Sequence, residues 1–190
     1  MRTFLLLSWM ALPVAGVAYH YGPGQDRLVL DDVARIVATA ESAVADEDWA
    51  FAVEQYGQAI AKLPEGHSDV SRVLRLERAK AQMNAQELPS AARELESLVD
   101  ELDGDASAPS QLKAEGRRAL ANSQFYMTWL LRLEGKTRAE WEPQIEAARQ
   151  NYRLLAESTD SATEKQDLEA AIRLERLELE DLQGLPLPSQ

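Results

Sequence analysis

Apolar and polar residues follow a helical period from Asp31 to the last predicted helix, which ends at residue 183. Apolar side chains recur three and four positions apart, which places them on one face of a helix. No stretch shows the strict alternation and β-branched enrichment of a strand. Gly, Pro and polar clusters separate the periodic segments. The pattern therefore predicts an all-α fold with helices at residues 31–46, 49–63, 69–86, 89–102, 109–134, 138–157 and 161–183.

Local signals support several of these helix starts. A hydroxyl and a carboxylate three positions apart can satisfy the free backbone donors of a first turn reciprocally. Proline suits a first turn because its missing N–H is not needed there. We therefore expect capping boxes at Thr137 with Glu140 and at Ser161 with Glu164, and helix starts at Pro89 and Pro109.

Three of the predicted helices share one order of residue sizes. A large apolar residue is followed three positions later by a small one, and four positions after that by another large one. The second helix lies 39 residues after the first, and the third lies 57 residues after the second. Because these positions share a helix face, the small residue allows a close approach between helices. The large residue fills the space between neighbouring pairs. The residues are Trp49, Ala52, Tyr56 and Ala59; Leu88, Ala91 and Leu95; and Ile145, Ala148 and Tyr152.

This pattern resembles the tetratricopeptide repeat, in which a small residue precedes an aromatic by four and a proline closes the second helix. The first repeat carries it best, with Ala52, Tyr56 and Pro64 in register and Ala40 at a small position of the first helix. The Trp and Leu that the family carries in the first helix of a repeat are absent from this chain. The second repeat has no closing proline, and the third has an enlarged first helix and a longer loop. The resemblance covers about residues 31–157.

The resemblance implies an α-α superhelix of about three hairpins within a repeat domain over residues 31–183. Its last helix, 161–183, would cap the stack. The alternative is an irregular helical bundle, since Leu and Ala at this spacing occur in any amphipathic helix. In the first helix of the third predicted hairpin, Gly116, Ala119 and Ser123 form a stripe of small residues. Such a stripe allows another helix to cross at a short distance. The apolar cluster at 125–131 is either core or an exposed interface.

The N-terminus carries a separate hydrophobic segment. Arg2 precedes an apolar run from Phe4 to Ala18, and about 15 helical residues span roughly 22 Å. This is short for a bilayer core of roughly 30 Å and typical of a signal peptide. Aromatic residues at 19–21 instead favour an uncleaved anchor at a membrane interface. A buried N-terminal helix is the remaining alternative.

Residues 1–18 are thus expected to be a signal peptide or membrane anchor, which we treat as a hydrophobic helix. Residues 19–30, with a break at Gly22-Pro23-Gly24, are expected to be a linker, and residues 184–190 a flexible tail. Either N-terminal interpretation places the body outside the cytoplasm. We therefore expect the chain at the periplasmic side of a bacterial inner membrane, or free in the periplasm after cleavage.

Composition and charge narrow the function. The 190 residues carry a net charge of −12, which argues against nucleic acid and against docking on anionic lipid. The absence of cysteine excludes disulfides and thiolate zinc sites. His20 and His67 have no ligand partner at metal-binding spacing. The acidic run Asp100–Asp105 fails as a calcium loop because Val99 and Ser110 occupy its terminal ligand positions. We expect no metal, no cofactor and no enzymatic activity.

The remaining expectation is a protein-interaction scaffold or adaptor. The family's groove positions, transferred to this chain, suggest a partner groove with arginines that favour an acidic segment or a terminal carboxylate. A structural homo-oligomer, or an accessory subunit of an exported enzyme or envelope complex, remains an alternative. The candidate groove residues are Glu41, Val44, Arg75, Arg78 and Gln82.

Overall fold

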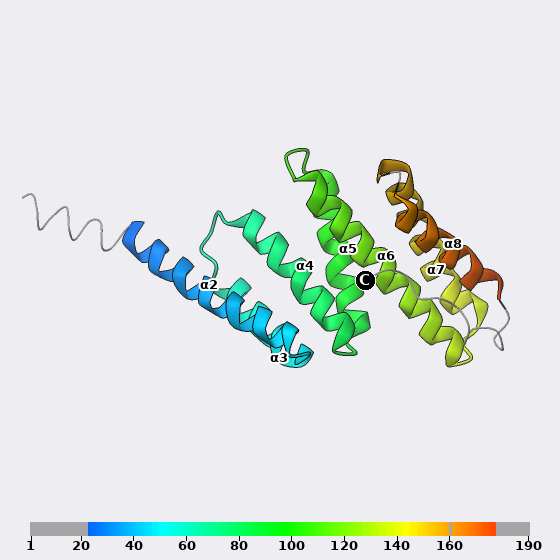
Figure 1. Cartoon of the computed structure of the whole chain (residues 1–190), viewed down its shortest axis with the longest axis horizontal. Helices are drawn as coiled ribbons and strands as arrows, with labels where there is room; N and C mark the ends of the chain where they lie inside the picture. The colour runs from blue at the N-terminus through cyan, green and yellow to red at the C-terminus, as the bar shows by residue number, and fades with distance from the viewer. Residues whose placement is uncertain (1–22, 160, 178–190) are drawn as a thin grey trace, which may run out of the picture. The chain divides into compact units, whose positions relative to one another are not determined.

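The computed structural model describes residues 23–159 and 161–177. Within these ranges all regular structure is helical, so the all-α prediction is confirmed. The predicted helices occur in order, most with bounds within two residues (Figure 1). None of these helices combines the length and apolarity that crossing a bilayer requires. The helices are α2 (Pro23–Ala45), α3 (Trp49–Lys62), α4 (Ser68–Asn84), α5 (Leu88–Gly104), α6 (Ser110–Leu133), α7 (Arg138–Thr159) and α8 (Ala162–Arg176).

Two helix bounds differ from the prediction by more than two residues. The first helix begins at Pro23 rather than Asp31, so residues 23–30 are helical where a linker was predicted. The last helix ends at Arg176, since Leu177 has an extended conformation. The N-terminal segment 1–18, the rest of the predicted linker up to residue 22, and the tail at 184–190 lie outside the described residues.

The chain forms two compact units, Met1–Ser71 and Arg72–Gln190, which we describe separately. In the first unit α2 packs against α3. An ion pair between Lys62 and Asp32 joins the two helices at the surface. Buried residues of α2 and α3 recur three and four positions apart, as expected for amphipathic helices. They are Val33, Ile36, Ala40, Ala43, Ala52, Tyr56 and Ala59.

The second unit has two apolar clusters, and α6 contributes to both. One cluster joins α6 to α4 and α5, and the other joins it to α7 and α8. This position explains why the apolar segment of α6 covers more than one side of the helix. Phe125 is fully buried in the second cluster, whereas Leu130 remains 41% exposed. The segment 125–131 is therefore partly core and partly surface.

The small-residue stripe of α6 allows the close crossing expected for it. A Cβ atom placed on Gly116 would lie 3.4 Å from Cδ1 of Leu102 and 3.6 Å from Cγ2 of Val99. Both contacts come from α5. Ala119 and Ser123 are also buried. Small side chains on α6 thus bring the second hairpin, α4–α5, against the third, α6–α7.

The three hairpins share one turn. After each first helix a residue adopts a left-handed conformation, with φ of 58° at Glu47, 65° at Gln86 and 71° at Gly135. The next backbone N–H then donates to the carbonyl five residues earlier. This geometry closes a helix C-terminus as a Schellman motif. The three bonds are Asp48 to Ala43 at 2.8 Å, Glu87 to Gln82 at 2.9 Å and Lys136 to Leu131 at 2.9 Å.

The third hairpin differs from the others at the start of its second helix, not in its turn. A longer loop was predicted there, and the connection at 134–137 is one residue longer than those at 46–48 and 85–87. The Gly135 turn leads directly into α7 at Arg138, whereas Ile145, the register counterpart of Trp49 and Leu88, follows two turns later. In α3 and α5 the same counterpart is the first residue of the helix. The extra residues extend the helix.

Candidate functional site

Three arginines of α4 meet carboxylates of α5. The arginines lie three positions apart, so they share a side of the helix. Nε of Arg72 lies 2.8 Å from a carboxylate oxygen of Glu101, and Nε of Arg75 lies 2.7 Å from one of Glu94. Arg78 pairs with Glu94 as well. Later residues of α4 thus meet earlier residues of α5, and the two helices run antiparallel.

The ion pairs hold these carboxylates in the charged state. Burial would raise the pKa of Glu94, but hydrogen bonds from Arg75 and Arg78 outweigh it and keep the pKa below its ordinary value. Hydrogen bonding to Arg72 lowers the pKa of Glu101 in the same way. Each carboxylate therefore neutralises part of the arginine charge at neutral pH.

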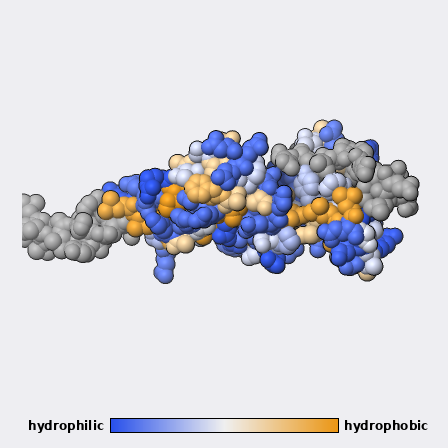
Figure 2. Space-filling model, turned by 90° about the horizontal axis from the view of Figure 1, so that it is seen from below, coloured by the Kyte–Doolittle hydropathy of each residue, from blue (hydrophilic) through white to orange (hydrophobic). Residues whose placement is uncertain are grey.

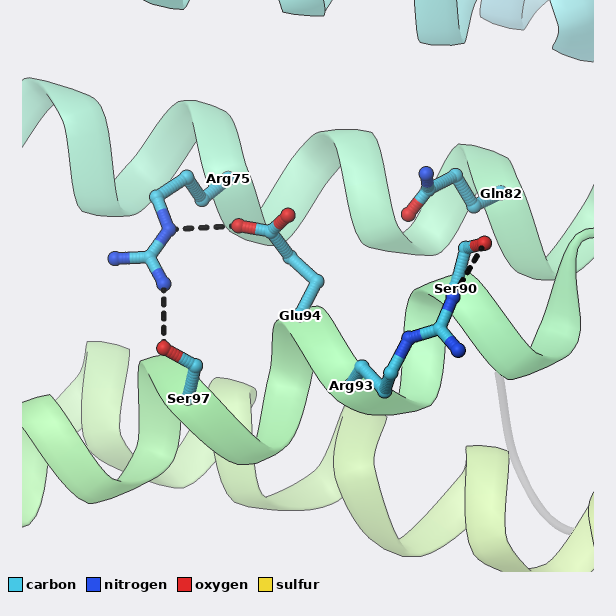
Figure 3. A pocket seen from close by; sticks show the side chains of 6 residues that line it. All are labelled: Arg75, Gln82, Ser90, Arg93, Glu94 and Ser97. Carbon is cyan, nitrogen blue, oxygen red and sulfur yellow. Dashed lines mark hydrogen bonds and ion pairs between the residues drawn. The ribbon is translucent and has the colours of Figure 1, made fainter.

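A pocket of about 370 Å³, open to solvent, lies beside this network (Figure 3). Six polar or charged residues of α4 and α5 line it. Arg75 points toward Glu94 and donates to the hydroxyl of Ser97 at 3.2 Å. Arg93 points toward Ser90 and donates to its hydroxyl at 3.4 Å. Gln82 completes the lining.

The candidate groove residues fall in two places. Glu41 is exposed and Val44 is half-buried on α2, in the first unit. Arg75, Arg78 and Gln82 lie in the second unit, where both arginines face α5 of their own hairpin. An acidic partner at Arg75 or Arg78 would have to displace Glu94. The arginines therefore stabilise the hairpin, and only Arg75 and Gln82 line the pocket.

The repeat-packing residues all lie in or next to the apolar interior. Ala52, Ala91 and Ala148 are completely buried, and the large residues four positions later, Tyr56, Leu95 and Tyr152, are buried as well. Leu88, Ala59 and Ile145 share this environment, while Trp49 is half-buried. The small-then-large order thus coincides with burial in all three second helices.

Sequence patterns missed several polar residues that the fold brings inside. Glu164 was expected to cap α8 with Ser161, but this prediction is wrong. Ser161 makes no capping bond with its side chain, and Glu164 accepts a 2.9 Å hydrogen bond from Nε of Arg118 on α6. Asp167 is buried one turn later. The other predicted capping box, Thr137 with Glu140 at the start of α7, forms in part. Glu140 accepts hydrogen bonds from the N–H and hydroxyl of Thr137.

Ser90, Arg93 and Ser97 were also missed as site residues. Their spacing of three and four positions on α5 places them on one side of the helix, which was the available signal. Among the described residues, no group of three or more His, Asp or Glu side chains is arranged to hold a metal ion. The view in Figure 2 shows hydrophilic residues over most of the drawn face, with smaller apolar areas between them.

No family model matches the chain, and no curated protein matches it either.

Proposed function

We propose that the chain is a non-enzymatic scaffold for protein–protein interaction, built of tetratricopeptide-like hairpins and held at the periplasmic face of the membrane. The observation that carries the proposal is the recurrence of one turn and one packing order in three hairpins. Glu47 and Gln86 lie 39 residues apart, as do the buried Ala52 and Ala91. A shared spacing for turn and core is what a structural repeat requires.

Contacts in the second unit support a stacked order of hairpins. Arg118 and Arg132 on α6 reach Glu164 and Leu174 on α8, so these two helices run parallel. The helix between them, α7, packs against both. A first helix that contacts its own partner and the following first helix is the arrangement of a helical solenoid. Apart from Ala162 in the first turn, the exposed positions of α8 are polar, as suits a helix that ends a stack.

The chemistry of the pocket favours binding over catalysis. A general acid or base works best with a pKa near the operating pH. Glu94, the carboxylate in the pocket lining, has its pKa lowered from the ordinary value. Ion pairs with Arg75 and Arg78 also occupy it. The remaining side chains supply hydrogen-bond donors and charge, which suit recognition of a polar segment.

Two experiments test the proposal. Alkaline phosphatase fused after Gly66, in the turn between α3 and α4, is expected to be active because the enzyme needs export. Activity of only a cytoplasmic reporter at this site would refute the periplasmic location. Photo-crosslinking from Glu41 and Ser97 in cells is expected to give discrete adducts. Ala139, which is exposed at the start of α7, is the control position. No adduct from either test position would contradict the scaffold.

A homo-oligomer is the second candidate, because Leu130 and Leu133 are 41% and 44% exposed one turn apart on α6. Exposed apolar pairs of this kind occur at subunit contacts. Light scattering after size exclusion of the intact chain separates the two candidates. A dimer that Leu130→Glu converts to a monomer would favour the oligomer, and a monomeric wild type would exclude it.

A further inference from the structure

The last two turns of α6 carry two exposed leucines. Leu130 and Leu133 are 41% and 44% exposed. Leu130 continues the side of α6 that faces α5, on which Gly116 approaches the last two turns of α5. A short connection makes the two helices antiparallel, and α5 has 17 residues against 24 in α6. Counted from the Gly116 contact, Leu88 at the start of α5 lies level with about residue 129 of α6. α5 therefore does not extend far enough to cover the two leucines.

The chain leaves α8 beside the same turns of α6. Arg132 donates a hydrogen bond to the carbonyl oxygen of Leu177. Leu177 has an extended conformation, so the backbone turns out of the helix there. Around the circumference of α6, Trp129 lies between Arg132 and Leu133, and Leu130 comes next. A chain that continues from Leu177 across the end of α6 therefore meets these side chains in that order.

An indole donor on this path has no acceptor among the described residues. Nε1 of Trp129 is buried and makes no hydrogen bond there. The ring packs against the cluster that joins α6 to α7 and α8, as Leu177 does. A buried donor without an acceptor costs free energy. A backbone carbonyl of the residues that follow Leu177 would satisfy this N–H.

Thirteen residues follow Leu177, and their sequence matches this surface. Fully extended, they span about 43 Å, so their length does not limit the path. Leucines stand at positions 179, 182, 185 and 187. The acidic residues at 178, 180 and 181 are complementary to Lys136, which is exposed directly after α6 and approaches Glu134 at 4.0 Å. Prolines at 186 and 188 disfavour a helix, which leaves the last leucines free to follow the surface of α6.

From these observations we propose that residues 178–187 form an intramolecular strap that crosses the end of α6 and covers Leu130 and Leu133. The hydrogen bond between Arg132 and Leu177 holds the start of the segment at the site. Its effective concentration there exceeds that of a second copy in dilute solution. The same leucines are the subunit contact of the homo-oligomer considered above, and the strap withholds them from a second copy. Part of 184–190, expected to be a flexible tail, thereby gains a place to bind.

The test uses a paramagnetic label on the intact chain. The chain has no cysteine, so Ser189→Cys gives a single attachment site for a nitroxide. NMR measures the relaxation that the label causes at the amides of Leu130 and Leu133. Because attachment at Leu177 alone brings the label near α6, variants of the segment decide the outcome. Leu182→Asp is expected to lower the paramagnetic relaxation at both amides at least threefold. Gln183→Asp adds the same charge without removing a leucine, and its effect is expected to be below 1.5-fold.

The α6 side of the contact has its own pair of variants. Leu133→Asp is expected to lower the paramagnetic relaxation at Leu130 at least threefold. Leu154→Asp places the same charge at a leucine that is 48% exposed on α7 and is expected to leave it unchanged. Equal effects of test and control variants on either side would overturn the strap.

A mixed sample identifies the chain that covers the leucines. Nitrogen-15-labelled chains without the nitroxide are mixed with nitroxide-labelled chains of natural isotope content. We expect no paramagnetic relaxation at Leu130 or Leu133 in this mixture, because the strap acts within one chain. Relaxation as strong as in the singly labelled chain would assign the surface to a second copy and overturn the proposal. The scaffold function does not depend on either result.

Discussion

The hydroxyl of Tyr152 on α7 donates a 2.6 Å hydrogen bond to the amide oxygen of Asn122 on α6. Both side chains are buried. Burial raises the pKa of the Tyr152 hydroxyl, and the nearby negative charges of Asp167 and Glu164 raise it further. The hydroxyl therefore remains a proton donor at any ordinary pH. Tyr152 thus fills the large position of the third hairpin and also satisfies a buried amide.

Tyr152→Phe tests whether this bond contributes to stability. The change keeps the ring but leaves the Asn122 oxygen without its Tyr152 donor, and we expect a loss of about 1–3 kcal/mol in the free energy of unfolding. Urea denaturation measures it. A double-mutant cycle with Asn122→Ala isolates the pair, and a coupling energy below about 0.5 kcal/mol would show that the bond contributes little.

The shared turn gives a reciprocal pair of substitutions. Gln86 has a left-handed φ of 65° and Gly135 one of 71°. Non-glycine residues pay a steric penalty in this conformation, whereas glycine does not. We expect Gln86→Gly to raise the free energy of unfolding by about 0.5–1 kcal/mol and Gly135→Gln to lower it by about 1 kcal/mol, both from urea midpoints. Effects of the same sign in the two variants would contradict the common turn geometry.

Apolar periodicity located each helix of the described residues, although not the first turns of α2, because burial of one helix side leaves a direct mark on the sequence. Tyr56 and Leu95 were found by this signal, and both are buried. Glu164 and Asp167 carry no such mark, since carboxylates usually lie in solvent. Only the approach of Arg118 from a distant helix makes a buried Glu164 acceptable, and single-sequence patterns do not show that pairing.

The same limit applied to the candidate site. Arg75 and Arg78 were selected by transferring the groove positions of the family that the chain resembles, but their neutralisation by Glu94 depends on which sides of α4 and α5 meet. Arg93 looks equivalent in the sequence, and only the packing of the hairpin shows that it forms a hydrogen bond with Ser90 and no ion pair with a carboxylate among the described residues. Predictions from sequence thus found the helices that build the pocket. They did not show which of its charged side chains form ion pairs within the hairpin.

Acid is expected to weaken the second hairpin. Hydrogen bonds from the hydroxyl of Ser107, from Arg72 and from the N–H of Ser107 lower the pKa of Asp105 from 3.8 to about 2. A carboxyl group with a lower pKa in the folded state stabilises the fold above its unfolded pKa, and this contribution is lost as pH falls through the folded value. The Asp105 contribution should therefore be complete above about pH 4 and disappear toward pH 2.

Urea midpoints measured between pH 5 and pH 2 check this expectation. The fall in stability should be smaller in Asp105→Asn than in wild type, because the variant has no carboxylate to protonate at this position. Asp100→Asn removes an exposed carboxylate from α5 and is the matched control. Parallel pH curves for wild type and Asp105→Asn would contradict the assignment of acid sensitivity to Asp105.

The end of α8 depends on a side chain from α6. Arg132 is buried, donates hydrogen bonds to the carbonyl oxygens of Leu174 and Leu177, and lies 4.8 Å from the ring centroid of Trp141. The last carbonyls of a helix have no partner within the helix, and a cation there also complements the helix dipole. Arg132 thus closes α8 and attaches it to α6.

Arg132→Lys keeps the charge but loses the planar pair of donors. We expect a loss of about 1–3 kcal/mol in local stability, seen as faster hydrogen exchange of the amides in Ala170–Arg176. Arg138→Lys is the matched control, because Arg138 lies over the same tryptophan at 5.8 Å but bonds to Glu142 instead of α8. Equal exchange in α8 for the two variants would mean that packing of Leu174 and Ala171, and not the arginine, holds this helix in place.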